Sequence, residues 1–372
     1  MHVLVTGANG HLGSNLVPAL LAAGHRVRAG VRHVADTAKT ASLRQMNVEL
    51  AETDLSRPDA LRAAMDGVDV LCHAAAVYSY FERGREQEII DVSVLGVQTA
   101  LRSAADAKVR KVVLTSSAVA LPFTLPGAPP STEQDWTSDM RVPYIRAKTE
   151  AERRAWKLAA ELGLNLVTVL PGSFGGPGFT KNTPTLDILE ALMLNAFRMG
   201  CPDSNLPYVD VRDVASAHVR AMEKDVQGRF IALNDELPTF RRLLEVMHGI
   251  DPRVKLPLPD AMTLLFPLFD WMNAKTLGTP RIANPDLIAS IRGRRWTRAT
   301  AGPGTCWAGN LVSRWNKASA TRWGNFASIE SNAPGSRSSR FRPEGRARLH
   351  QALPAWMWNA VLSDPRATST PM

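Results

Sequence analysis

MHVLVTGANGHLGSNLVPALLAA, residues 1–23, decides the fold. Residues 2–5 are a short apolar, β-branched run typical of a buried strand, and leucines then recur at helical spacing. Three glycines separate the strand from the helix: Gly7, Gly10 and Gly13. Such glycines permit a tight turn, let the backbone approach phosphates and let the helix pack on the strand. We therefore predict a dinucleotide pyrophosphate site at the helix N-terminus, and we expect these residues to contact it: Gly7, Asn9, Gly10, His11, Leu12 and Gly13.

The net charge of +9 over 372 residues is concentrated at one end of the chain. Residues 294–372 hold 12 Lys+Arg against 3 Asp+Glu, whereas the preceding residues hold 32 of each. The body therefore offers no basic surface for a polyanion, and we expect no nucleic-acid partner. No apolar run reaches the roughly 20 residues that a membrane span needs, and no leader precedes the first strand. We expect a cytoplasmic protein without membrane association.

Neither the cysteines nor the histidines show paired spacing. Cys72, Cys201 and Cys306 lie far apart, and the eight histidines are scattered. We expect neither a disulfide nor a metal site.

Strand-like and helix-like segments alternate after the first helix. Strands are expected at 25–31, 48–51, 69–73 and 111–114, with helices at 58–65 and 85–107 between them. This alternation predicts an α/β protein with a Rossmann-type, doubly wound parallel sheet. The ligand of such a sheet lies at the carboxyl ends of the strands.

The residues after the second strand indicate which dinucleotide binds. An NAD site usually places a carboxylate there, whereas Arg32 stands here and Asp36 lies several residues further on. We predict NADP, with NAD less favoured and Arg32 binding the 2′-phosphate. Asp54, followed by Leu55, is predicted to bond the adenine amino group. Three small residues after the fourth strand are expected against the cofactor: Ala74, Ala75 and Ala76.

The fifth strand ends in three hydroxyl residues, Thr115, Ser116 and Ser117, and Tyr144 and Lys148 open the next long helix. A spacing of four puts the last two on one helical face. A phenol has a pKa of about 10, so it needs a nearby cation to exchange a proton near neutrality. We predict that Lys148 supplies this charge and bonds the nicotinamide ribose, while Ser117 holds the substrate oxygen during hydride transfer.

These motifs together resemble an extended short-chain dehydrogenase/reductase of the NAD-dependent epimerase/dehydratase superfamily, most closely its dihydroflavonol-reductase-like branch. The resemblance spans about residues 1–293 and includes further segments: 135–139, 149–152, 171–177 and 208–214. It implies an NADP-dependent carbonyl reductase, with a homodimer as a possible assembly. It also implies cofactor contacts near the nicotinamide: Thr115, Ser116, Tyr144, Lys148, Pro171, Gly172 and Ser173. Three residues depart from the family pattern: Ser93 for an Asn, Ala147 for a Ser and Leu170 for an Arg.

The chain up to residue 293 is expected to divide into two parts. Residues 1–177 are expected to form mainly the NADP-binding domain, and 178–293 mainly a substrate lobe with helices at 186–199, 240–248 and 261–277. These helices are apolar stripes of the kind that builds a core, so we assign no substrate contacts to them. The few basic residues favour an apolar carbonyl substrate over a nucleotide sugar.

Residues 294–372 differ in composition and hold six of the nine tryptophans: Trp296, Trp307, Trp315, Trp323, Trp356 and Trp358. One interpretation is a basic, aromatic arm that binds nucleic acid. Another is out-of-frame translation, which would leave a disordered tail. Codons for residues 305–309, read in the neighbouring frame, encode Leu-Gly and allow Trp next, which resembles the family's Leu-Gly-Trp-x-Pro ending. We favour the second interpretation, which the coding DNA would test.

Alternatives to the reductase stay open at this point. A nucleotide-sugar epimerase or dehydratase on the same scaffold would bind NAD tightly. A regulator that senses NADP without catalysis would not need the Ser, Tyr and Lys. A nucleic-acid-binding protein would lose salt-sensitive binding on truncation near Arg294.

Overall fold

The computed structural model describes most of the chain. The described residues are 1–75, 86–177, 184–198, 201–234 and 237–258, with 268, 271–272, 275–276, 289–290 and 294. Ala76, nearly all of the expected helix at 261–277 and the segment after residue 294 lie outside them. No helix among the described residues is long and apolar enough to span a membrane.

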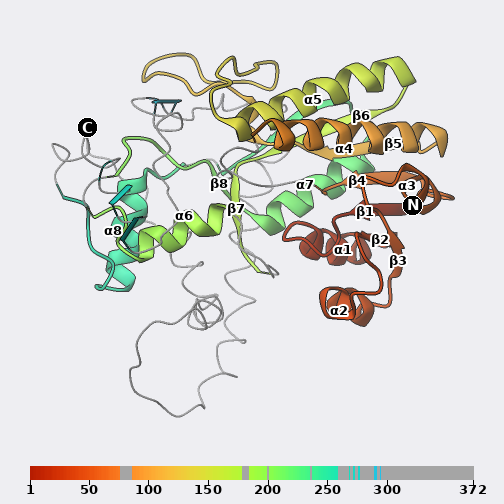
Figure 1. Ribbon diagram of the computed structural model, residues 1–372, viewed down its shortest axis with the longest axis horizontal. Helices are drawn as coiled ribbons and strands as arrows, with labels where there is room; N and C mark the ends of the chain where they lie inside the picture. The colour runs from red at the N-terminus through yellow and green to blue at the C-terminus, as the bar shows by residue number, and fades with distance from the viewer. Residues whose placement is uncertain are drawn as a thin grey trace, which may run out of the picture.

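A seven-stranded parallel sheet forms the centre of the molecule, with the strand order β3-β2-β1-β4-β5-β6-β9 (Figure 1). The strands are β1 (His2–Thr6), β2 (Arg26–Val31), β3 (Glu49–Glu52), β4 (Val70–His73), β5 (Lys111–Thr115), β6 (Leu166–Pro171) and β9 (Gly228–Ala232). The chain winds outward from β1 to β3 and then returns to β4 on the other side of β1. The predicted doubly wound sheet is confirmed, and its switch point lies between β1 and β4, where such sheets bind ligands.

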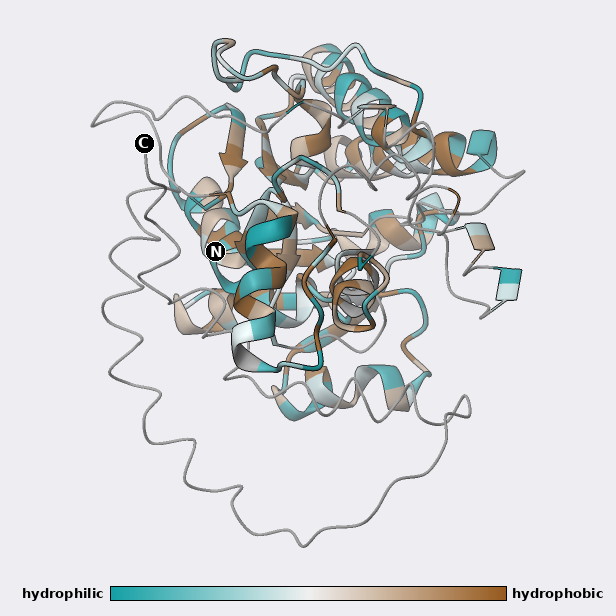
Figure 2. Cartoon of the chain, turned by 90° about the vertical axis from the view of Figure 1, so that its left-hand side faces the viewer, coloured by the Kyte–Doolittle hydropathy of each residue, from teal (hydrophilic) through white to brown (hydrophobic). Residues whose placement is uncertain are grey.

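Helices cover both faces of the sheet because the strand residues alternate between two cores. Val3 and Val5 pack with α1 (Gly13–Ala22), α2 (Thr37–Gln45) and α7 (Val211–Glu223). Leu4 points the other way, toward α3 (Pro58–Ala64), α4 (Glu86–Asp106) and α5 (Pro143–Leu162). In Figure 2 the strands that can be seen near the centre are mainly brown while the helices carry both brown and teal, as expected for amphipathic helices on an apolar sheet.

A smaller lobe lies beyond the carboxyl ends of the strands (Figure 1). It contains the short parallel pair β7 (Ser173–Gly175) and β8 (Tyr208–Asp210), with α6 (Pro184–Met193) and α8 (Phe240–Ile250). Phe197 and Phe240 stack in its core with ring centroids 5.8 Å apart. This lobe has a hydrophobic cluster of its own, separate from the two cores of the sheet.

Most predicted elements are present with bounds shifted by one or two residues. The helix predicted at 186–199 is an exception, because α6 ends at Met193 and the chain turns through Asn195, whose φ of 63° is left-handed. Pro171, an expected cofactor contact, is the last residue of β6, followed by Gly172. The helix α2 was not predicted, because it buries only Thr40 and Leu43 and so has a weak apolar period.

Candidate functional site at the carboxyl ends of the strands

The glycine turn has the shape expected of a pyrophosphate cradle. Gly7 adopts a φ of +68°, and a Cβ there would lie 3.0 Å from the backbone of Ala75, so the turn after β1 touches the chain after β4. A Cβ on Gly13 would lie 2.2 Å from the Gly7 carbonyl oxygen, so only a glycine at this position lets the start of α1 lie so close to the turn after β1. Within α1, all of which the structure describes, the first turn holds no acidic residue and the N-cap makes no side-chain bond. These features fit a bound diphosphate.

The residues around this turn differ in their burial. Leu12 is buried in the core, so any cofactor contact there would come from its backbone. Asn9 and Gly10 are more accessible, and His11 is buried. Ala74 and Ala75 follow β4, where their small size matches the approach of Gly7.

Arg32 lies exposed directly after β2. The Asp54 carboxylate accepts hydrogen bonds from the backbone and hydroxyl of Ser56, and these bonds, with the charges of Arg32 and His33, lower its pKa. Asp36 instead caps α2 and pairs with Lys39. The end of β2 therefore presents a guanidinium, with a carboxylate from the end of β3 nearby.

Helix α5 carries Tyr144 and Lys148 one turn apart. It begins at Pro143, which suits the first helical position, and it ends at Gly163 in the left-handed conformation. Tyr144 is buried in a small cluster with Val142 and Ile145, and this cluster packs against Val119 of the short helix η1 (Ala118–Ala120), which lies directly after Ser117. Ser117 caps η1, its Oγ accepting from the Val119 backbone nitrogen at 3.4 Å. The end of β5 and the start of α5 are therefore neighbours.

Five predicted residues from four separate segments line one cavity of about 30 Å³ between the sheet, α4 and α5. They are Leu55, Ala75, Thr115, Ser116 and Lys148. The cavity is large enough for one or two water molecules. Ser93, which departs from the family pattern, lines the same cavity as Lys148. Its hydroxyl donates to the Ile89 carbonyl.

Burial dominates the electrostatics of this cavity. It lowers the pKa of Lys148 to about 8, while the Glu152 carboxylate acts in the opposite direction. Burial, and then the charge of Lys148, lower the pKa of His73 to about 4. His73 Nδ1 lies 2.8 Å from the Thr6 hydroxyl, which also accepts from the Ala75 backbone nitrogen. The site thus pairs a neutral imidazole with an ammonium that titrates near physiological pH.

Two residues at the end of β5 are held by helices on opposite faces of the sheet. The Thr115 hydroxyl lies 2.8 Å from Nε2 of His218 on α7, whose Nδ1 lies 2.8 Å from the Val214 carbonyl oxygen. Burial lowers the pKa of His218 to about 4, so the ring is neutral and Thr115 donates to it. Ser116 donates to Glu152 on α5 at 2.7 Å. The proton of the Thr115 hydroxyl is therefore already engaged by His218.

The segment after β6 is fixed to the glycine turn. The backbone nitrogen of Ser173 donates to the Pro207 carbonyl, and a Cβ on Gly172 would lie 2.1 Å from that oxygen. His11 Nε2 lies 3.2 Å from the Gly176 carbonyl, and the Asn15 amide donates to the Pro177 carbonyl at 2.8 Å. The three predicted contacts 171–173 thus lie in a segment whose far end touches the turn after β1.

The sequence motifs did not reveal the polar residues that support the site, namely Thr6, His73, His218 and Arg229. A usable signal was present for two of them, since Thr6 and His73 end otherwise apolar strands. The other two follow the predicted catalytic residues by many positions, and no local pattern links them to those residues.

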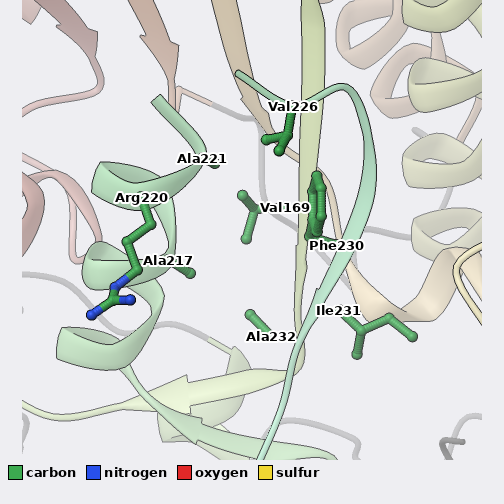
Figure 3. Close-up of a pocket in the computed structure, with 8 residues that line it drawn as sticks. All are labelled: Val169, Ala217, Arg220, Ala221, Val226, Phe230, Ile231 and Ala232. Atoms are coloured by element: carbon green, nitrogen blue, oxygen red, sulfur yellow. The ribbon is translucent and has the colours of Figure 1, made fainter. Parts of the chain in front are cut away.

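A second cavity, of about 20 Å³, lies between α7 and the strands β6 and β9 (Figure 3). Its walls are almost entirely hydrocarbon, with Val169, Phe230 and Ala232 facing Ala217. The guanidinium of Arg220 points away from the other labelled side chains. We interpret this space as a packing void of the core.

Comparison with known proteins places the chain among reductases. The model of the NAD dependent epimerase/dehydratase family matches residues 3–233, which include every predicted cofactor and catalytic residue. Sterol demethylase protein B of Methylococcus capsulatus is 36% identical over 267 residues, 70% of this chain and 78% of that protein. Cinnamoyl-CoA reductase 1 of Oryza sativa subsp. japonica is 34% identical over 267 residues, 68% and 76% of the two chains. The yeast methylglyoxal/isovaleraldehyde reductase Gre2 complexed with NADPH has a TM-score of 0.61 at 24% identity, covering 70% and 86%.

Proposed function

Because the chain belongs to the NAD-dependent epimerase/dehydratase family and is an oxidoreductase of its dihydroflavonol-reductase-like branch, we propose that it uses NADPH to reduce a ketone or aldehyde. The proposed substrate is small and apolar or aromatic. Tyr144, Lys148 and Ser117 are the proposed catalytic residues. The observation that carries the proposal is that the cluster containing Tyr144 packs against η1, directly after Ser117, with Lys148 one turn further along α5.

Each proposed role follows from the chemistry of its side chain. The Ser117 hydroxyl donates a hydrogen bond to the carbonyl oxygen and orients it. Tyr144 donates its phenolic proton to that oxygen as negative charge develops. The Lys148 ammonium stabilises the phenolate that remains and bonds the ribose hydroxyls. When bound, the nicotinamide supplies the hydride.

NADPH is the proposed coenzyme because of the charges at the end of β2. Arg32 is exposed there, and Asp36 is engaged as the cap of α2. A guanidinium matches a phosphate with two parallel hydrogen bonds. The yeast reductase Gre2, which shares the fold, is itself complexed with NADPH, and this agrees with the choice.

The substrate class rests on the surroundings of Tyr144 and on the relatives. Tyr144 belongs to an apolar cluster with Val142 and Ile145, against which Val119 and Phe123 pack, so the residue has apolar neighbours. The relatives include reductases named for cinnamoyl-CoA and dihydroflavonol, both aromatic. The homodimer implied by the resemblance and the cytoplasmic location expected from the composition stay predictions.

The test is a panel of apolar and aromatic aldehydes and ketones, assayed with NADPH and with NADH. We expect turnover with NADPH, and we expect Tyr144→Phe to lower kcat by a factor of about 10² to 10⁴ while NADPH binding is retained. Unchanged turnover in Tyr144→Phe would refute the mechanism. Conversion of a nucleotide sugar with tightly bound NAD, and no carbonyl reduction, would favour the epimerase alternative.

A further inference from the structure

Glu152 is a buried carboxylate one turn beyond Lys148 on α5. Only 1% of its side chain is exposed, and four donors surround it. They are Ser116 Oγ at 2.7 Å, Thr168 Oγ1 at 2.7 Å, and Arg229 Nε and Nη2 at 3.0 and 3.3 Å. The donors come from the end of β5 and from β6 and β9. One side chain therefore connects the helix that carries Tyr144 and Lys148 to three neighbouring strands.

Arg229 makes this burial of charge tolerable. Its side chain is only 7% exposed, and its Nη1 donates to the carbonyls of Glu133 and Asp135 at 2.8 and 2.5 Å. The guanidinium lies 3.7 Å from the centroid of the Trp136 ring. A buried ion pair is maintained when its remaining hydrogen-bonding groups are satisfied, as they are here. The pair is therefore fixed in position rather than mobile.

The hydrogen bond from Ser116 is the contact closest to the reacting groups. Ser116 directly precedes Ser117, and its backbone nitrogen donates to the Val169 carbonyl. Thr115 is held from the opposite face of the sheet by His218. The last residues of β5 are thus held on both faces, and only the Glu152 side of this arrangement carries charge.

We propose that Glu152 is a positioning residue for carbonyl reduction. Held by Arg229, its carboxylate fixes Ser116, and with it Ser117, against α5, and it places a negative charge one turn from Lys148. This inference deepens the proposed function and rests on it. It predicts that Glu152 acts on the rate of the chemical step and not on coenzyme affinity.

The main test replaces both members of the ion pair, in the variant Glu152→Gln/Arg229→Met. Removing both charges avoids leaving one of them buried and unpaired. We expect kcat to fall about 10- to 100-fold, because a small displacement of an orienting group slows the reaction strongly. The KM and the NADPH dissociation constant should stay within about twofold. The matched control is Glu150→Gln on the same helix, which removes a carboxylate paired with Arg146 at the surface and should change none of these.

A second variant covers the case in which the double variant does not fold. Ser116→Ala keeps the Glu152–Arg229 pair but removes the hydroxyl that joins it to the end of β5. We expect a lower kcat with unchanged NADPH affinity, because the Ser116 hydroxyl is engaged by Glu152 and the implied cofactor contact of Ser116 would then come from its backbone, which the variant keeps. Wild-type kcat in Ser116→Ala, or in a folded Glu152→Gln/Arg229→Met variant that binds NADPH, would overturn the proposal.

A readout that does not need turnover separates this inference from the proposed function. In protein with ¹³C-labelled lysines, the Lys148 resonance is identified by its loss in Lys148→Met and then titrated by NMR. We expect its titration to move to lower pH when Glu152 is neutralised, because a nearby negative charge favours the ammonium. An unchanged titration would overturn the proposed influence on Lys148 even if the wild type reduced no carbonyl at all. Absence of turnover in the wild type would instead count against the proposed function.

Discussion

Replacing Lys148 with methionine should stabilise the fold while it abolishes activity. The ammonium is largely buried beside His73 and Ser116, and its pKa is lowered from 10.5 to about 8. The folded protein therefore holds this proton less tightly than the unfolded chain does. Methionine has a similar length and carries no charge, and Glu152 keeps Arg229 as its partner.

The magnitude follows from the difference between the two pKa values. Each unit corresponds to about 1.4 kcal/mol, so the buried charge costs at most about 3 kcal/mol when both states are protonated. That cost is fully present below pH 8. Between pH 8 and 10.5 only the unfolded chain binds the proton, so wild-type stability rises with pH. The advantage of Lys148→Met should thus be about 3 kcal/mol at pH 7 and about 1 kcal/mol at pH 9.5.

Urea-induced unfolding of the coenzyme-free protein at these two pH values measures the effect, as a shift in midpoint at constant slope. Lys157→Met is the matched control, because Lys157 lies exposed on the same helix and its replacement should change stability by less than about 0.5 kcal/mol. If Lys148→Met is less stable than the wild type, or if its advantage is the same at both pH values, the assignment of Lys148 as a desolvated ammonium is wrong.

Three further predictions concern other parts of the site. Arg32→Gln should raise the NADPH dissociation constant about 10- to 100-fold and leave that of NADH within about twofold by calorimetry, and equal losses would contradict a 2′-phosphate contact. His73 and His218 have pKa values lowered to about 4, so the free energy of unfolding should fall between pH 6.5 and 4, where the unfolded chain takes up protons that the folded protein does not. Urea midpoints that do not change across this range would show that these rings are not buried and neutral. Gly13→Ala should abolish coenzyme binding or folding because its Cβ would lie 2.2 Å from the Gly7 oxygen, whereas Gly249→Ala, with nothing near its Cβ, should fold normally by circular dichroism.

The sequence was sufficient for five of the seven strands of the sheet, among which β1, β4 and β5 are mainly apolar runs between glycine and helix signals, whereas β6 and β9 were not predicted. The segment 69–73 illustrates this, since an apolar run with both faces buried becomes the central strand β4. The helix α2 escaped prediction because it packs through two residues only, so its period is weak. The end of α6 was misplaced because the left-handed turn at Asn195 interrupts a segment whose apolar pattern continues.

The sequence could predict those parts of the site that lie within one local motif. Tyr144, Lys148 and Glu152 share one helix face at a spacing of four, so the sequence alone brings them together. Arg229 and His218 join the site only because β9 lies beside β6 and because α7 packs against the sheet. Such contacts depend on the order of strands in space, and that order is absent from any local spacing. The pKa of Lys148 likewise cannot be predicted from spacing, because burial lowers it and the charge of Glu152 raises it, and both depend on the folded structure.

The bonds from His11 and Asn15 to the carbonyls of Gly176 and Pro177 have a practical consequence for protein engineering. The Asn15 amide also donates to the His11 carbonyl, and the His11 ring lies 5.5 Å from that of Phe174, so both segments share one set of contacts. Grafting a glycine turn from a relative to change coenzyme preference would leave the recipient's 174–177 segment facing foreign side chains. A chimera must therefore exchange both segments together.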